Sequence, residues 1–427
     1  MPELAIDADA PERVPELVEH LFRREHARLV AGLVRVLGPE RLELAEDVVQ
    51  DALHRALRTW SVAGIPDDPT AWLLTVARNR ALDVARRERV ARERAERLAR
   101  WSAEPAARAE QDLDALHLVA ACCHPALPIE ARVALTLKTA SGFGVAEIAR
   151  ALCTSEDAVA QRILRAKQRL AGLDHAAFDP EAPLEPARRA AVLEVLYLLF
   201  NEGHSATTGD AQVRGELVHE ALRLGRLFAR RPADATAELE ALLALQLFLA
   251  ARLPARVDAE GDVVTLARQD RARWDRALLA EAWTRFERAC AGDELTSAHV
   301  EAAIAAAHAA APSYAATDWR AILEQYDLLA RLAPSPVVAL NRAVALAKAH
   351  GIAAGLAELD RIAADELLEL LFTYHATRGL FLWHAGRRGD ALDACRRALA
   401  ADGNAPERAL VARRIESIER GDEPEPF

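Results

Sequence analysis

The stretch GFGVAEIARALCTSEDAVAQRILRAKQRL (142–170) decides the interpretation of the fold. Apolar residues recur every three or four positions on both sides of a short turn, which predicts a helix from Val145 to Leu152 and a second helix after Thr154. Thr154 is expected to cap this second helix, with Asp157 completing an approximate capping box. The arrangement is the helix-turn-helix plan, in which the second helix enters the major groove of DNA.

The second helix has one apolar and one basic face. The apolar face is expected to hold Val159, Ile163, Ala166 and Leu170. The residues that fall largely outside it are Gln161, Arg162, Arg165, Lys167 and Arg169. A generic helical hairpin has the same period, but the turn, the cap and the basic outer face together favour DNA binding.

Upstream, DDPTAWLLTVARNRALDVARRERVARER (67–94) predicts a basic helix that begins after Asp68, an N-cap followed by Pro69. Residues 78–100 contain nine arginines and four acidic residues. Four of these arginines lie four positions after an acidic residue, and such pairs stabilise a solvent-exposed helix without any partner. The arginines outside such pairs are Arg78, Arg80, Arg86, Arg89 and Arg94. Guanidinium groups in this number suit phosphates and base edges, so the segment favours nucleic-acid contact.

The preceding segment, PERLELAEDVVQDALHRALRTW (39–60), predicts an amphipathic helix with an acidic stripe. Glu43, Asp47 and Asp51 repeat every four residues beside the apolar face. Two interpretations stay open, a solvated helix surface and a docking surface for a basic partner. The loop SVAGIPDDPT (61–70) separates this helix from the basic one, because its glycine and prolines forbid helix continuation.

Composition places the whole chain in the all-α class. Of its 427 residues, 52% are hydrophobic and 28% are charged, as in a globular protein. Alanine, leucine, arginine and glutamate dominate, and all are strong helix formers. The longest apolar stretch, 241–253, is shorter than the ~20 residues of a membrane helix, and the first residues show no secretory leader. Five cysteines without a CxxC pair suit reduced thiols, so we expect a cytoplasmic protein with no membrane partner.

Charge divides the chain into two unlike parts. The net charge of −11 comes mostly from the C-terminal part, because residues 1–175 hold 25 basic and 27 acidic residues while the remainder holds 29 and 38. Such asymmetry suggests a nucleic-acid-facing part attached to an acidic body. The proline-rich segment 173–186 is the predicted boundary. Beyond it, helical hairpins centred on Gly351 and Gly386 resemble tetratricopeptide (TPR) repeats.

These residues carry a family resemblance. The order of AEDVVQDAL (45–53), AWLLTVARNRALDVARRE (71–88) and AEIARALCTSEDAVAQRILRAKQRL (146–170) resembles regions 2 and 4 of sigma-70 family RNA polymerase sigma factors, and most closely the extracytoplasmic-function (ECF) group. The remainder, including FNEGHSATTGD (200–210) and PSPVVALNRAVALA (334–347), resembles the C-terminal extension of one ECF branch, a domain of unknown function with TPR character. The resemblance implies region 2 over 17–100, region 4 over 112–172 and a TPR-like domain over 187–420.

The resemblance also implies roles for individual residues. Core RNA polymerase would bind Asp47, Gln50 and Asp51. The −10 promoter element would contact the loop 61–70 together with Arg78, Asn79, Arg80, Asp83, Arg86 and Arg87. The −35 element would contact Ser155, Glu156, Ala158, Gln161, Arg162, Arg165 and Lys167. Trp60 and Trp72 are candidates for stacking on an unpaired base, although core packing is favoured for both. The partners implied are core polymerase, promoter DNA and a small YCII-like protein.

Other functions compete with this one. The first is a helix-turn-helix regulator with a TPR-like sensor domain, which would act on duplex DNA alone, and the second is a scaffold that recruits a protein partner. The polar segment 200–210 resembles a hydrolase or ligand site, but a capped interhelical turn is favoured. Cys122, Cys123 and His124 resemble a metal-binding fragment, but buried small residues are favoured. We therefore assign no catalytic residue, no metal and no cofactor, and we regard the C-terminal domain as a regulator in cis of undetermined sign.

Overall fold

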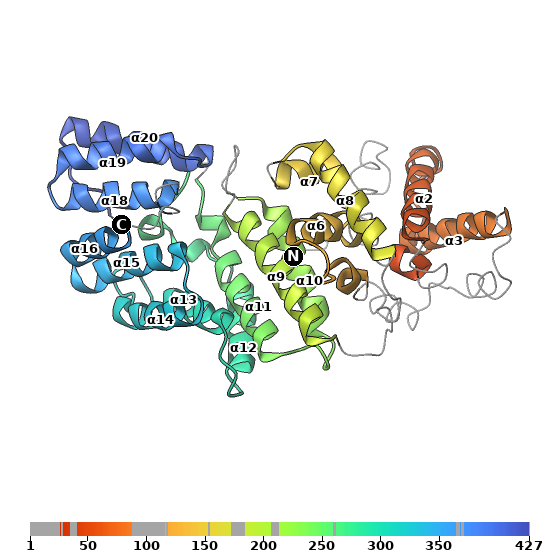
Figure 1. The fold of residues 1–427 in the computed structure, drawn as a ribbon. Helices are drawn as coiled ribbons and strands as arrows, with labels where there is room; N and C mark the ends of the chain where they lie inside the picture. Colours follow the sequence, from red (N-terminus) through yellow and green to blue (C-terminus); the bar gives the residue numbers. More distant parts are fainter. Residues whose placement is uncertain are drawn as a thin grey trace. The chain divides into compact units, whose positions relative to one another are not determined.

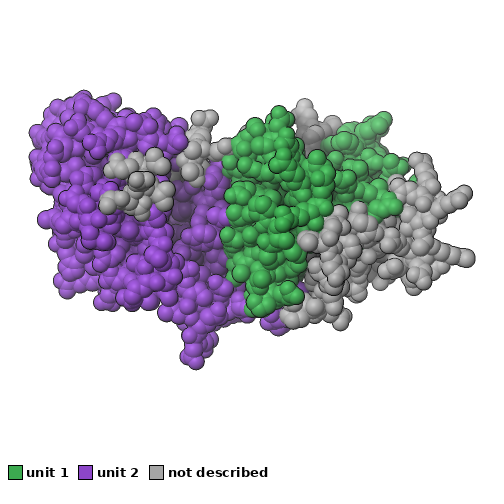
Figure 2. Space-filling model, viewed as in Figure 1, with its two compact units in different colours: residues 1–195 green, residues 196–427 purple. Residues whose placement is uncertain are grey.

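The computed structural model describes residues 26, 29–34, 41–87, 116, 118–152, 154–171, 184–205, 213–258, 262–363, 368 and 371–426. Regular structure in these ranges is helical, and the one β pairing they contain is an isolated bridge between Val257 and Val263. The all-α prediction is confirmed. The chain divides into two compact units, residues 1–195 and 196–427 (Figures 1 and 2), which we describe separately. None of the helices in the described ranges is both long and apolar enough to cross a membrane.

The first unit contains short and medium helices, and the division between the units falls inside the last of them. They are α2 (Leu42–Ala63), α3 (Pro69–Arg87), α6 (Ile129–Leu135), the π-helical η3 (Thr136–Ala140), α7 (Val145–Ala151), α8 (Glu156–Ala171) and α9 (Pro186–His204).

Helices α2 and α3 share one apolar core. The predicted apolar face of α2 is confirmed, because Val48, Val49 and Ala52 are at most 2% exposed. The break between the helices occurs at Gly64, whose φ of 81° is accessible to glycine without strain. Asp68 caps α3 as predicted, since its Oδ1 accepts a hydrogen bond from the backbone N–H of Ala71 at 2.9 Å.

Helices α7 and α8 form the predicted helix-turn-helix, with one correction. Helix α8 begins at Glu156, so its N-cap is Ser155 and not Thr154. The Ser155 hydroxyl accepts a hydrogen bond from the backbone N–H of Ala158 at 3.2 Å. The capping box centred on Thr154 was wrong because an N-cap side chain satisfies the N–H groups two or three residues later, which here lie within reach of Ser155.

The second unit is built from helices that contact the next helix along the chain (Figure 1). They are α10 (Gly215–Ala229), α11 (Ala237–Ala250), α12 (Arg276–Ala289), α13 (Ser297–Ala310), α14 (Trp319–Leu332), α15 (Pro336–His350), α16 (Ile352–Ile362), α18 (Phe372–His384), α19 (Arg388–Ala400) and α20 (Ala405–Arg420). The two predicted hairpins are present, as α15–α16 and α18–α19, and their turns contain Gly351 at φ 95° and Gly386 at φ 76°.

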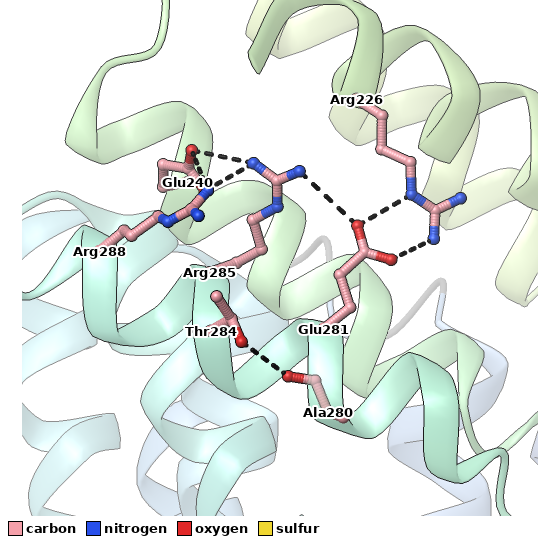
Figure 3. A network of polar contacts seen from close by, with 7 residues as sticks. All are labelled: Arg226, Glu240, Ala280, Glu281, Thr284, Arg285 and Arg288. Atoms are coloured by element: carbon pink, nitrogen blue, oxygen red, sulfur yellow. Dashed lines mark hydrogen bonds and ion pairs between the residues drawn. The ribbon is translucent and has the colours of Figure 1, made fainter. Parts of the chain in front are cut away.

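An ion-pair network joins α10, α11 and α12 (Figure 3). Arg226 donates two hydrogen bonds to the carboxylate of Glu281, at 3.0 and 2.6 Å. Arg285 binds Glu240 at 3.0 Å and approaches Glu281 to 3.7 Å. The hydrogen bonds from Arg226 lower the pKa of Glu281, which therefore stays ionised at neutral pH. Bidentate arginine pairs fix the geometry of the helices that they join.

Gly355 permits the close approach of α15 to α16, and its replacement is expected to destabilise the second unit. A Cβ at this position would lie 2.5 Å from Ala347 Cβ and 2.8 Å from Phe381 Cε2. Overpacking of rigid groups costs about 1–3 kcal/mol, whereas replacing a helical glycine with alanine gains about 1 kcal/mol, so Gly355→Ala should lower the free energy of unfolding by up to about 2 kcal/mol. Urea denaturation followed by circular dichroism measures the change.

Gly389→Ala is the matched control for this prediction. A Cβ at Gly389, also in a helix of the second unit, meets no atom within 4 Å. We expect this variant to be as stable as the parent or up to about 1 kcal/mol more stable. Equal stability of the two variants would contradict the packing argument.

Candidate nucleic-acid interface

The predicted polymerase-binding residues lie on the exposed side of α2. Asp47, Gln50 and Asp51 are all exposed, as is Glu43 one turn earlier. The opposite side of the helix is buried in the core. Acidic side chains that make no contribution to the core are available to a partner with basic groups.

Arg80 of α3 connects this acidic stripe with the predicted −10 surface. Its Nε donates to Asp51 Oδ2 at 2.9 Å, and the two side chains are 41% and 55% exposed. An ion pair with this exposure is worth less than about 1 kcal/mol. The pair therefore opens readily when either residue meets a partner.

The other predicted −10 residues are spread along α3. Asn79 and Asp83 are exposed, and Arg78 is half-buried. Arg86 and Arg87 belong to the last turn of α3, but their side chains lie outside the described residues, as do Arg89 and Arg94 entirely. The described part of α3 thus exposes Asn79 and Asp83, and the rest of the predicted basic segment lies outside the described residues.

The two tryptophans pack against each other at the core shared by α2 and α3. Trp60 is 2% exposed, and its ring lies edge to face with that of Trp72, with 5.3 Å between the ring centroids. Trp72 is half-buried against the same core. Base stacking on Trp60 is excluded in this conformation, because its faces are covered.

Helix α8 presents the predicted −35 residues unevenly. Ser155, Glu156, Gln161 and Arg165 are exposed, whereas Ala158 and Arg162 are half-buried. The inner face is buried as predicted, with Val159, Ile163 and Ala166 at most 6% exposed and Leu170 half-buried. Two of the predicted contacts, Ser155 and Ala158, form the helix cap, and the exposed side chains that follow them are available to a partner.

Lys167 does not lie on the exposed face. Its Nζ donates to Glu46 Oε2 of α2 at 2.5 Å, and the two side chains are only 14% and 8% exposed. Thr139 Oγ1 donates to the other carboxylate oxygen of Glu46 at 2.7 Å. We call Glu46, Thr139 and Lys167 the inter-region contact, because it joins the segments that resemble regions 2 and 4. Sequence reasoning missed Glu46, although its spacing from Leu42, Val49 and Leu53 places it on the buried side of α2.

Burial next to the inter-region contact keeps His26 neutral. The imidazole is 2% exposed, and burial, assisted by the positive charges of Lys138 and Lys167, lowers its pKa to about 3. A histidine whose pKa is lower in the folded than in the unfolded chain stabilises the fold above pH ~6.5. That contribution is lost as the pH falls below this value, because the unfolded chain then binds the proton more readily.

The first unit should therefore become less stable in acid through His26. Between pH 6.5 and about 4 we expect a loss near 1.4 kcal/mol per pH unit in the parent that is absent in His26→Phe. Amide hydrogen exchange resolved by mass spectrometry, at several pH values, measures this in the full chain. His54→Gln is the control, since His54 is exposed on α2. An equal acid sensitivity in His26→Phe and the parent would contradict the assignment.

The remaining candidate sites have structural roles. Cys122 and Cys123 are at most 1% exposed, and burial raises the pKa of Cys123 to about 12, so this thiol stays protonated. His124 Nδ1 accepts a hydrogen bond from the backbone N–H of Ala126 at 3.0 Å. No group of His, Cys, Asp and Glu side chains in the described ranges could hold a metal ion. In the 200–210 segment, α9 ends at His204 and Glu202 pairs with Arg214, whereas Asp210 lies outside the described residues.

Comparison with known proteins gives three family matches in chain order. Residues 21–90 match sigma-70 region 2, residues 117–170 match sigma-70 region 4, and residues 188–290 match a family of unknown function (DUF6596). An uncharacterized protein of Rhizobium meliloti (strain 1021) is 40% identical over 386 residues, which cover 88% of this chain and 90% of that protein. No solved structure matches the chain.

Proposed function

We propose, from the premise that the chain belongs to the sigma-70 family of RNA polymerase sigma factors with the ECF-type combination of regions 2 and 4, that its C-terminal domain regulates its own initiation activity. As a sigma factor it binds core RNA polymerase and promoter DNA and is not an enzyme. The sigma-factor function rests on one observation, the match to region 2 followed along the chain by the match to region 4. The functional domains proposed are residues 17–100, 112–172 and 187–420.

For polymerase binding we propose the acidic stripe of α2, through Asp47, Gln50 and Asp51. Their exposure supports this role, since docking on basic helices of the polymerase requires carboxylates that the core does not use. The −10 element is proposed to contact Arg78, Asn79, Arg80, Asp83, Arg86 and Arg87. Single-stranded DNA would displace the weak pair between Arg80 and Asp51.

For the −35 element we propose contact with the exposed side chains of α8, and Lys167 joins them only after the inter-region contact opens. Gln161 and Arg165 support direct readout, because both are exposed and lie on neighbouring turns, with Gln161 in the N-terminal half of the helix. The distance between Arg165 Nη2 and Gln161 Oε1 is 3.4 Å, which is a long hydrogen bond that leaves both groups available.

The C-terminal domain is proposed as a TPR-like regulator in cis. The uneven charge supports the role, because an acidic domain competes with DNA for a basic surface. The helical hairpins at Gly351 and Gly386 support TPR character. A small YCII-like protein as partner, and action in the cytoplasm, follow from the resemblance to the ECF branch.

Run-off transcription tests both parts of this proposal. We would compare full-length protein and a 1–195 fragment, each with core polymerase on genomic fragments. The cut follows residue 195 because α9 contributes to the first unit, where Arg188 donates to the Ala120 carbonyl at 3.0 Å and Glu194 pairs with Arg132 at 2.7 Å. We expect initiation at discrete sites, and rates that differ about fivefold or more between the two proteins. A faster fragment indicates inhibition, and a slower one indicates activation.

Two outcomes would contradict the proposal. Equal rates would remove the regulatory role of the C-terminal domain and leave the sigma-factor assignment intact. Absence of core-dependent initiation by both proteins, with retained duplex binding, would favour a helix-turn-helix regulator instead.

A further inference from the structure

The second unit contains a cavity that the sigma-factor function does not use. It has a volume of about 580 Å³ and lies among α11, α13, α14, α15 and the part of α9 that belongs to this unit. Pockets for small molecules have volumes of about 300–1,000 Å³ and combine an apolar lining with a few polar groups. The apolar lining here includes Leu245, Leu249, Ile304 and Leu329, and the polar groups include Tyr197 and Asn201.

Glu301 of α13 brings a carboxylate into this cavity without a basic partner. The Tyr197 hydroxyl donates to Glu301 Oε2 at 3.1 Å, and no lysine, arginine or histidine among the described residues forms an ion pair with it. Burial raises the pKa of Glu301. A desolvated carboxylate that lacks a counter-ion suits a ligand that supplies an ammonium group.

Arg252, which follows α11, brings the opposite charge. No acidic side chain among the described residues pairs with it. Its guanidinium donates a long hydrogen bond to Gln269 at 3.4 Å and lies over the ring of Trp274, 5.6 Å from the ring centroid. Burial, together with Arg256 and Arg271 nearby, lowers the pKa of Arg252 to about 9, so the guanidinium stays charged at neutral pH. This part of the cavity therefore has an excess of positive charge that an anionic group would neutralise.

Glu301 and Arg252 both line the cavity, and neither forms an ion pair with another described residue. Arg252 lies near His308, because burial and then Arg252 lower the pKa of that imidazole to about 4. His308 and Glu301 both line the cavity from α13, seven positions apart. At about 1.5 Å of rise per residue, they are separated by about 10 Å along the helix. A ligand that carries an ammonium group and a carboxylate group can contact each of these two charges.

We propose that this cavity binds a short apolar peptide with free termini, with its ammonium group on Glu301 and its carboxylate on Arg252. A peptide with free termini carries both complementary charges, and its apolar side chains suit the apolar lining of the cavity. At about 30 Å³ per water-sized group, the volume admits about 20 non-hydrogen atoms, the size of a small tripeptide. The site itself is independent of promoter recognition, and only an effect of the peptide on initiation would rest on the proposed cis regulation.

Titration calorimetry on the full chain tests the proposal with the tripeptide Ala-Leu-Ala. We expect the free peptide to bind, and the N-acetylated and C-amidated forms to bind about tenfold more weakly or worse, because each lacks one charge-assisted contact. Glu301→Gln should remove the preference for a free amino group only, and Arg252→Gln the preference for a free carboxylate only. The matched controls are Glu287→Gln and Arg276→Gln, both exposed on α12, which should bind as the parent does.

Several results would overturn the proposal. They are absence of binding by the free peptide at millimolar concentration, equal affinity for the blocked forms, and equal affinity for leucine alone. Should the two charge variants melt early by circular dichroism, Val337→Trp replaces them, since Val337 lines the cavity and is 53% exposed. This variant should keep the melting temperature and lose the peptide, and retained binding would contradict the location. These readouts do not depend on transcription, so they fail or succeed separately from the proposed function.

Discussion

Reversing the charges of Asp47 and Asp51 together is expected to reduce initiation by core RNA polymerase about 100-fold or more. Both carboxylates are exposed on α2, so Asp47→Arg/Asp51→Arg changes four units of charge on one surface without disturbing the apolar face. Like charges brought together across an interface cost several kcal/mol, and each 1.4 kcal/mol corresponds to about tenfold in affinity. Run-off transcription and direct binding to fluorescently labelled core polymerase measure the effect.

Controls separate this effect from general charge repulsion. Glu287→Arg/Glu324→Arg makes the same change in net charge on exposed positions of the second unit and should bind core polymerase as the parent does. Arg80→Gln removes the pair with Asp51 but keeps the acidic stripe, so it too should leave core binding unchanged. Full core binding by the doubly reversed protein would contradict the assignment of this surface.

The sequence predicted the elements whose information is local. The apolar period of α2, the Asp68 cap and the buried face of α8 follow from residues within one or two helical turns of each other. The family order of regions 2 and 4 could be identified for the same reason, since each motif is a continuous stretch. The cap of α8 was displaced by one residue because Thr154 and Ser155 are adjacent and both can act as N-caps.

Contacts between distant segments could not be predicted in this way. Glu46 and Lys167 are 121 residues apart in the sequence. Taken alone, the pattern of α2 describes Glu46 as one more charged residue of an amphipathic helix, and the pattern of α8 places Lys167 on its basic face. Which polar side chain is buried depends on how the helices pack, and packing is not encoded in the period of either helix. The cavity beside Glu301 is similarly built from helices whose individual periods indicate only a buried core.

The inter-region contact gives the second large effect, because replacing Lys167 leaves Glu46 buried without its counter-ion. Both side chains are at most 14% exposed. Removing one partner of a buried ion pair costs about 3–5 kcal/mol, since the remaining charge keeps its desolvation penalty. We expect Lys167→Met to lower the free energy of opening of α2 and α8 by about 3 kcal/mol, measured by amide hydrogen exchange with mass spectrometry in the full chain.

A second substitution shows whether charge or packing causes this loss. In Glu46→Gln/Lys167→Met the buried group is neutral and still accepts the hydrogen bond from Thr139, so more than half of the lost stability should return. Arg169→Met is the control on the same helix, since Arg169 is exposed and its replacement should change stability by less than about 0.5 kcal/mol. If the double variant is no more stable than Lys167→Met, loss of side-chain packing and not the unpaired carboxylate explains the effect. In that case the two regions would be held together at this contact by van der Waals packing. Lys167 could then leave the contact and approach DNA without another group having to neutralise Glu46.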